Sequence, residues 1–192
     1  MTDITSNSAS SPGRRIIRIR VLGVGGAGCN AVEQMAALPL EGVDYTVLNT
    51  DQAALQRITH ANRQLLGPQT TRGLGAGGEP ERGRKAAEED AQMLRQLCDG
   101  ADLVFIVAGM GGGTGTGAAP VVARIAREAG ALAVAIAITP FHCEGVHRQK
   151  RAASGLQTLR AASDSVICLP NEKILAALDE KTQLSDALRQ VN

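Results

Sequence analysis

Short runs of apolar residues recur along this 192-residue chain, and each is followed by a segment with helical periodicity. Several of these runs do not alternate with polar residues, as in DLVFIVA (102–108) and ALAVAIAI (131–138). Strands of this kind are buried on both faces, which is typical of parallel sheets covered by helices. The sequence therefore predicts an α/β fold, a parallel sheet with helices on both faces.

The order of the predicted elements extends this pattern along the chain. A helix is expected between successive strands, so that each parallel pair is joined by a crossover. Further strands are predicted at 16–22, 44–49, 64–66 and 165–169. Helices are predicted at about 30–38, 51–58, 81–98 and 145–162. Another helix is predicted after the strand at 102–108, with Pro120 in its first turn, where a missing N–H costs little.

Composition and charge exclude several classes of protein. Apolar residues make up 44% of the chain and aromatic residues only 2%, so the core must consist mainly of Val, Ile, Leu and Ala. A net charge of +1 gives no electrostatic basis for binding nucleic acid. No apolar run reaches the roughly 18 residues of a membrane span, and the N-terminus lacks the apolar core of a signal peptide. The four scattered cysteines fit a reducing compartment. We expect a cytoplasmic protein with one domain at 14–180 after a disordered tail at 1–13.

The most unusual segment is GMGGGTGTGAAP at 109–120, in which five of the seven residues at 111–117 are glycine. The other two are Thr114 and Thr116. Because glycine is costly to order, so many in one turn indicate that the backbone approaches something closely. Loop amides and the positive end of a following helix are typical of phosphate binding, and the threonines add hydroxyl donors. A flexible loop is the alternative, although such loops usually contain Ser, Asn, Asp or Lys.

Two further glycine-rich segments, GVGGAG (23–28) and TRGLGAGGEP (71–80), follow a strand or lead into a helix. All three segments can therefore meet at the carboxyl ends of the strands, where parallel sheets bind ligands. GVGGAG matches the GxGxxG pattern of dinucleotide sites, with Asp51 as a ribose-binding acid, but an NAD site would leave the other two segments unexplained. Asp51 could instead cap the short helix that it begins. No segment matches GxxxxGK[ST], which excludes a P-loop.

The segment GMGGGTGTGAAPVVA resembles the signature loop of the tubulin superfamily, and specifically that of the FtsZ family of bacterial cell-division GTPases. Five further segments resemble the same family in order and spacing. They are VLGVGGAGCNAV, VLNTDQAAL, TRGLGAGGEPERGRKAAEED, PFHCEGVHRQ and LPNEKIL. The resemblance covers 16–192 and implies a Rossmann-like GTPase domain that binds GTP or GDP, with Mg²⁺ brought by the nucleotide.

The resemblance also implies which residues surround the nucleotide. They are Gly26, Ala27, Gly28, Cys29 and Asn30 in the first phosphate loop; Gly77 and Gly78 in the loop that senses the terminal phosphate; Gly111, Gly112, Gly113, Thr114, Gly115, Thr116 and Gly117 in the signature loop; Glu144 and Arg148 at the ribose; Asn171 on the nucleotide side; and Asn192 at the base. Two positions depart from the family. Glu79 stands where Asn is usual, and Leu188 stands where an aromatic residue usually stacks on the base.

Several of these residues have structural alternatives. Asn30 could cap its helix, and Asn171 could cap a helix after the preceding proline. Glu144 and Arg148 could form a solvated surface pair, because a spacing of four places them on one helical face. No metal site is expected in the chain.

Among the four cysteines, Cys29 is expected to be the reactive thiol. It lies in the first phosphate loop at the start of a helix, where amides and the helix dipole would lower its pKa. Bound nucleotide would then shield it from alkylation.

The resemblance further implies a head-to-tail homopolymer at the division site, in contact with other cell-division proteins only indirectly and without membrane insertion. In that family, an acidic loop of the adjacent protomer positions the attacking water. The resemblance implies that residues 181–192 are the start of the central helix, and that the acidic loop after this helix and the C-terminal domain are absent from these 192 residues. The chain is thus expected to bind GTP, to contain no catalytic residue and to hydrolyse GTP poorly alone. The alternative is a nucleotide-binding interaction module without hydrolysis.

Overall fold

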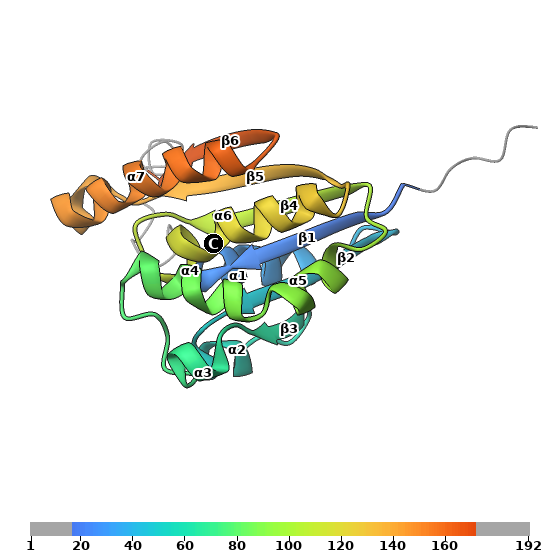
Figure 1. Ribbon diagram of the computed structural model, residues 1–192, viewed down its shortest axis with the longest axis horizontal. Coiled ribbons are helices and arrows are strands. Elements are labelled where there is room, and N and C mark those ends of the chain that lie inside the picture. Colours follow the sequence, from blue (N-terminus) through green and yellow to red (C-terminus); the bar gives the residue numbers. More distant parts are fainter. Residues whose placement is uncertain (1–16, 172–192) are drawn as a thin grey trace, which may run out of the picture.

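The computed structural model describes residues 17–171, and within them six strands form one parallel sheet (Figure 1). The strand order is β3-β2-β1-β4-β5-β6, with β1 and β4 at the centre. The strands are β1 (Ile19–Val24), β2 (Val43–Asn49), β3 (Asn62–Leu65), β4 (Leu103–Gly109), β5 (Leu132–Thr139) and β6 (Ser165–Pro170). All five pairings are parallel, which confirms the predicted fold class.

Helices cover both faces of the sheet. They are α1 (Gly25–Ala36), α2 (Gln52–Gln56), α3 (Pro68–Thr71), α4 (Pro80–Glu89), α5 (Ala91–Cys98), α6 (Thr114–Glu128), the 3₁₀ turn η1 (His142–Glu144) and α7 (Val146–Ala162). Residues of α1 and α2 pack in one apolar cluster, and residues of α4, α5, α6 and α7 pack in the other. Figure 1 shows α4, α5 and α6 in front of the sheet and α1 behind it. The expectation of helices on both faces is confirmed.

Two helices begin earlier than predicted, because the glycine-rich segments form their first turns. α1 starts at Gly25 rather than near residue 30, and α6 starts at Thr114. Pro120 therefore lies in the interior of α6, and the prediction that it occupies the first turn is wrong. Proline has no N–H, so the carbonyl of Thr116 lacks the usual helical hydrogen bond from the residue four positions later. Glycine has low helix propensity, and tertiary packing overrides it here.

The charged helix predicted at 81–98 is two helices separated at Asp90. The Asp90 carboxylate accepts a hydrogen bond from the amide of Gly67 at 2.6 Å. This bond fixes the connection between β3 and α3 to the α4–α5 junction. Asp90 has a φ of −100° and a ψ of 23°, outside the α-helical range, so α4 ends before it and α5 begins after it.

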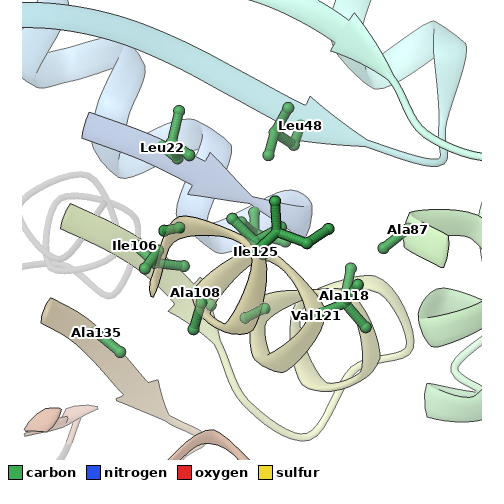
Figure 2. Close-up of a cluster of buried hydrophobic side chains, with 14 of the residues drawn as sticks. Leu22, Leu48, Ala87, Ile106, Ala108, Ala118, Val121, Ile125 and Ala135 are labelled. Atoms are coloured by element: carbon green, nitrogen blue, oxygen red, sulfur yellow. The ribbon is translucent and has the colours of Figure 1, made fainter. Parts of the chain in front are cut away.

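The core on the α6 side is built mainly from small and aliphatic side chains, as the shortage of aromatic residues requires. Figure 2 shows side chains of β1, β2, β4, β5 and α4 gathered around α6. Ala108, Ala118 and Ala135 are fully buried, and Ile125 is one of the largest buried side chains. These alanines let α6 lie close to the sheet. The position of α6 matters for the site, because its first turn is the signature segment.

Within residues 17–171, no helix is long and apolar enough to cross a membrane. The tail predicted at 1–13 and the central-helix start predicted at 181–192 lie outside the described residues.

Candidate functional site

The glycine-rich segments 23–28 and 109–120 meet at the carboxyl ends of β1 and β4. Gly25 has a φ of +72°, and a Cβ atom built on it would lie 2.7 Å from the amide nitrogen of Gly115. Thr114 Oγ1 lies 2.6 Å from Thr50 Oγ1, which joins the start of α6 to the residue that follows β2. The carboxyl ends of three neighbouring strands are thus connected through backbone and hydroxyl contacts.

The third glycine-rich segment, 71–80, lies against the start of α6. A Cβ atom on Gly113 would lie 2.8 Å from the Ala76 side chain and 2.9 Å from the amide nitrogen of Glu79. The amide of Gly75 donates a hydrogen bond to the carbonyl of Thr50 at 3.0 Å. The structure therefore brings all three segments to one edge of the sheet, as the sequence predicts.

Two helices begin at this edge, α1 after β1 and α6 after β4. Neither has an acidic residue in its first turn, and neither N-cap residue caps the helix with its side chain. No carboxylate within these first turns therefore neutralises the positive end of either helix dipole or occupies the first-turn amides. Such a pair of helix N-termini is suited to bind the phosphates of a nucleotide.

The glycines at this edge differ in what surrounds them. A Cβ atom on Gly26 or Gly112 would meet no atom within 4 Å, so the backbone there faces open space. A Cβ on Gly28 would lie 2.1 Å from the carbonyl oxygen of Val107, and one on Gly117 would lie 1.8 Å from that of Pro80. Close packing of the protein on itself therefore accounts for part of the glycine content, in addition to the close approach to a ligand that the sequence predicts.

Thr116 differs from Thr114 in its surroundings. Thr116 is 4% exposed, and its Oγ1 accepts a hydrogen bond from the amide of Gly111 at 2.8 Å. Its hydroxyl thus holds the loop between β4 and α6 in shape. Thr114 is half-buried and, through its contact with Thr50, lies closer to the other glycine-rich segments.

Glu144 and Arg148 lie beside the signature segment. Arg148 Nη1 is 2.7 Å from Glu144 Oε2, and the other carboxylate oxygen of Glu144 accepts a hydrogen bond from the amide of Phe141 at 2.8 Å. A Cβ atom on Gly111 would lie 2.8 Å from Arg148 Cγ. The two side chains are paired, as their spacing predicts. About half of the Arg148 side chain is exposed, so it is accessible at the edge of the site.

Asn171 follows β6 at the same edge of the sheet. Its Oδ1 atom is buried and makes no hydrogen bond to any other described residue. A buried amide oxygen without a partner is costly, which is consistent with a group that binds a ligand. The predicted base-side residue Asn192 and the nearby Leu188 lie outside the described residues.

The structure resolves two of the capping alternatives. Asn30 is the sixth residue of α1, whose N-cap is Val24, so Asn30 does not cap the helix. Asp51 does cap α2, because its Oδ1 accepts a hydrogen bond from the amide of Ala54 at 3.0 Å. Among the described residues, no group of three or more His, Cys, Asp or Glu side chains could hold a metal ion.

The prediction that Cys29 is the reactive thiol is wrong. Cys29 is only 3% exposed, and its Sγ lies 3.5 Å from the carbonyl oxygen of Leu48. Desolvation by burial raises its pKa to about 12. The hydrogen bond to the Leu48 backbone lowers the pKa, but by less than desolvation raises it. The thiol points into the core on the α1 side, so the helix dipole does not stabilise a thiolate there.

Alkylation of the folded protein is therefore expected to modify Cys143 first, because its side chain is exposed. Cys29 and Cys98 are buried and have raised pKa values of about 12 and 11, so both should react at least about a hundredfold more slowly. Peptide mass mapping after timed treatment with iodoacetamide measures this order. Modification of Cys29 before Cys143 in folded protein would show that α1 is not packed as described.

Sequence reasoning did not find two residues that hold the site together. Thr50 is fully buried and contacts Thr114 and the 71–80 segment, although only its position after a strand could have indicated this. Arg151 on α7 donates a hydrogen bond to the carbonyl of Gly78. No sequence pattern signals that bond, because it joins residues that are 73 positions apart.

Comparisons with known proteins agree with this geometry. Residues 18–179 match the family described as the Tubulin/FtsZ family, GTPase domain. The chain is 49% identical over 174 residues to the cell division protein FtsZ of Buchnera aphidicola subsp. Acyrthosiphon pisum, covering 91% of this chain and 45% of that protein.

Solved structures with the same fold include an empty FtsZ dimer from M. jannaschii, with a TM-score of 0.85 at 41% identity over 91% of this chain and 50% of that chain. CetZ2 from Haloferax volcanii, a GTPγS-bound protofilament, has a TM-score of 0.80 at 28% identity over 91% and 55%. The chain thus spans about half the length of these relatives. By its sequence and its fold, the chain belongs to the Tubulin/FtsZ family and corresponds to the GTPase domain of that family.

Proposed function

We propose that this chain binds GTP and GDP as the nucleotide-binding domain of a filament-forming cell-division GTPase. The observation that carries the proposal is the pair of helix N-termini, α1 and α6, which begin side by side without acidic residues in their first turns. The open space at Gly26 and Gly112 lies at these two helix starts and leaves room for phosphate oxygens.

Each part of the site then has a role toward the nucleotide. Amides at the starts of α1 and α6 bind the phosphates, except those of Gly111 and Gly117, which donate to Thr116 Oγ1 and to the Gly113 carbonyl. Gly77 and Gly78 lie near the terminal phosphate. Glu144 and Arg148 bind the ribose and nearby groups, held in place by their mutual ion pair. The unpartnered Oδ1 of Asn171 accepts a hydrogen bond from the nucleoside. Mg²⁺ would be brought to the site by the nucleotide and held mainly by its phosphates.

We further propose that hydrolysis and assembly involve a second protomer. Relatives of the chain have been solved as an FtsZ dimer and as a CetZ2 protofilament. In a head-to-tail filament, the nucleotide on this domain would face the next protomer, whose acidic loop would position the attacking water. Such filaments would form in the cytoplasm at the division site, and other division proteins would contact them indirectly.

The exposed carboxylate of Glu79 favours a second candidate function. Glu79 precedes α4 and does not cap it with its side chain, and its amide nitrogen lies close to Gly113. A carboxylate near the terminal phosphate would repel it, which favours bound GDP over GTP. In that case the chain is a nucleotide-binding interaction module without hydrolysis.

Guanine nucleotides are expected to stabilise the protein more than adenine nucleotides or NAD. At a ligand concentration of 100 times Kd, binding adds about 2.7 kcal/mol to the free energy of unfolding. A thermal-shift titration with GTP, GDP, ATP and NAD measures the difference. Equal stabilisation by ATP and GTP would contradict guanine preference, and stabilisation by NAD alone would support a dinucleotide site.

A further inference from the structure

Arg151 connects α7 to the glycine-rich segment at 75–78. It lies one turn after Arg148 on α7, and its Nη1 donates a hydrogen bond to the carbonyl of Gly78. A Cβ atom on Gly78 would lie 3.3 Å from the same nitrogen. The guanidinium is therefore in direct contact with the last glycine before Glu79 and α4.

The charge of the Arg151 guanidinium is not neutralised by a carboxylate among the described residues. The side chain is half-buried, and its Nε atom is buried without a hydrogen-bond partner among residues 17–171. Within that part of the chain, no carboxylate forms an ion pair with it, whereas Arg84 and Arg124 on the neighbouring helices both have one. An arginine stays charged under these conditions, so its contact with the Gly78 carbonyl is a charge-assisted hydrogen bond.

The segment that Arg151 contacts has unusual conformational freedom. Gly75, Gly77 and Gly78 all have positive φ values, between 61° and 81°, and glycine loses more backbone entropy on ordering than any other residue. The start of the segment is fixed by the hydrogen bond from the Gly75 amide to the Thr50 carbonyl. Its end is fixed by Arg151.

We propose that Arg151 is a positioning residue for the 75–78 segment and thereby sets the preference for GTP over GDP. The second part rests on the proposed function, in which this segment lies near the terminal phosphate. Without Arg151, the segment would have to be ordered when the terminal phosphate binds, which reduces the affinity for GTP. GDP does not reach the segment, so its affinity changes less.

Three variants test the proposal. Arg151→Ala removes the contact, and Arg151→Lys keeps a cation that can reach the Gly78 carbonyl. Arg160→Ala is the matched control, because Arg160 is an exposed arginine on the same helix that donates a hydrogen bond to Cys168 Sγ rather than to the 75–78 segment. The first measurement is hydrogen–deuterium exchange of the amides at 75–79 in nucleotide-free protein. The second is the affinity of each variant for GTPγS and for GDP.

Arg151→Ala is expected to increase exchange at 75–79 about tenfold and to lower GTPγS affinity about tenfold, while GDP affinity changes less than about threefold. Arg151→Lys should restore much of both effects, and Arg160→Ala should behave as the wild type. Unchanged exchange at 75–79 in Arg151→Ala would overturn the positioning role. Equal losses of GTPγS and GDP affinity would overturn the role in nucleotide preference. Wild-type protein that binds neither nucleotide would refute the proposed function and the preference with it, while the exchange result would still decide the positioning role.

Discussion

Replacing Gly28 with alanine is expected to lower the free energy of unfolding by about 3 kcal/mol, whereas replacing Gly26 should leave it unchanged or raise it by up to about 1 kcal/mol. Both glycines lie in the first turn of α1 and neither has a positive φ. The new Cβ on residue 28 would lie 2.1 Å from the Val107 carbonyl oxygen, so α1 would have to move away from β4. The Cβ on residue 26 would enter open space.

The same two substitutions distinguish an effect on stability from an effect on nucleotide binding. A methyl group on residue 26 would project into the space that we assign to phosphate oxygens, so Gly26→Ala should bind GTP at least about tenfold more weakly while remaining folded. Urea unfolding monitored by circular dichroism and nucleotide titration of the folded protein measure the two effects. If Gly26→Ala bound GTP with the wild-type affinity, the phosphates would have to bind somewhere other than at Gly26. An unchanged urea midpoint in Gly28→Ala would contradict the close packing of α1 on β4.

GTP turnover by a polypeptide of residues 1–192 is expected to be close to background and to rise at least about a hundredfold on addition of a suitable partner. The partner is a full-length FtsZ relative whose own nucleotide site has been disabled but whose acidic loop is intact. Positioning of the attacking water and general-base assistance commonly contribute factors of about 10² to 10⁴ each. Phosphate release measures turnover, and light scattering measures filament growth.

The controls for this experiment use the site described above. At GTP concentrations below the wild-type Kd, Gly26→Ala in the same mixture should lower the stimulation at least about tenfold, because the turnover must come from nucleotide on this chain. Rapid hydrolysis by residues 1–192 alone would contradict a shared active site. GTP binding without stimulation by any partner would favour the interaction module that Glu79 suggests.

The sheet could be predicted from the sequence because its inner strands β1, β2, β4 and β5 are largely buried on both faces. Residues 103–108 and 131–138 contain no polar side chain, so neither run resembles a strand with one solvated face. The observed β4 and β5 lie within one residue of the predicted bounds. The convergence of the glycine-rich segments follows from the parallel arrangement, since the carboxyl ends of all the strands meet at one edge.

The helix starts and the chemistry of Cys29 could not be predicted, because both depend on contacts between distant residues. Helix α6 begins within a glycine run because Gly117 packs against the Pro80 carbonyl of α4, and that contact has no sequence signal. Similarly, the position of Cys29 at a helix start suggested a low pKa. Cys29 lies on the side of α1 that faces the core, so burial raises the pKa of its thiol instead.

The strand order also has a consequence for synthesis on the ribosome. β1, β2 and β3 can pair as soon as they emerge, but the other edge of β1 pairs with β4. Arg18, just before β1, is hydrogen-bonded to Asp102, 84 positions later. At about 5–20 residues per second, translation of that interval takes on the order of ten seconds. During this time the backbone edge of β1 that later pairs with β4 stays unpaired and open to association with other nascent chains. Recovery of folded protein should therefore depend on how quickly the ribosome passes from β3 to β4.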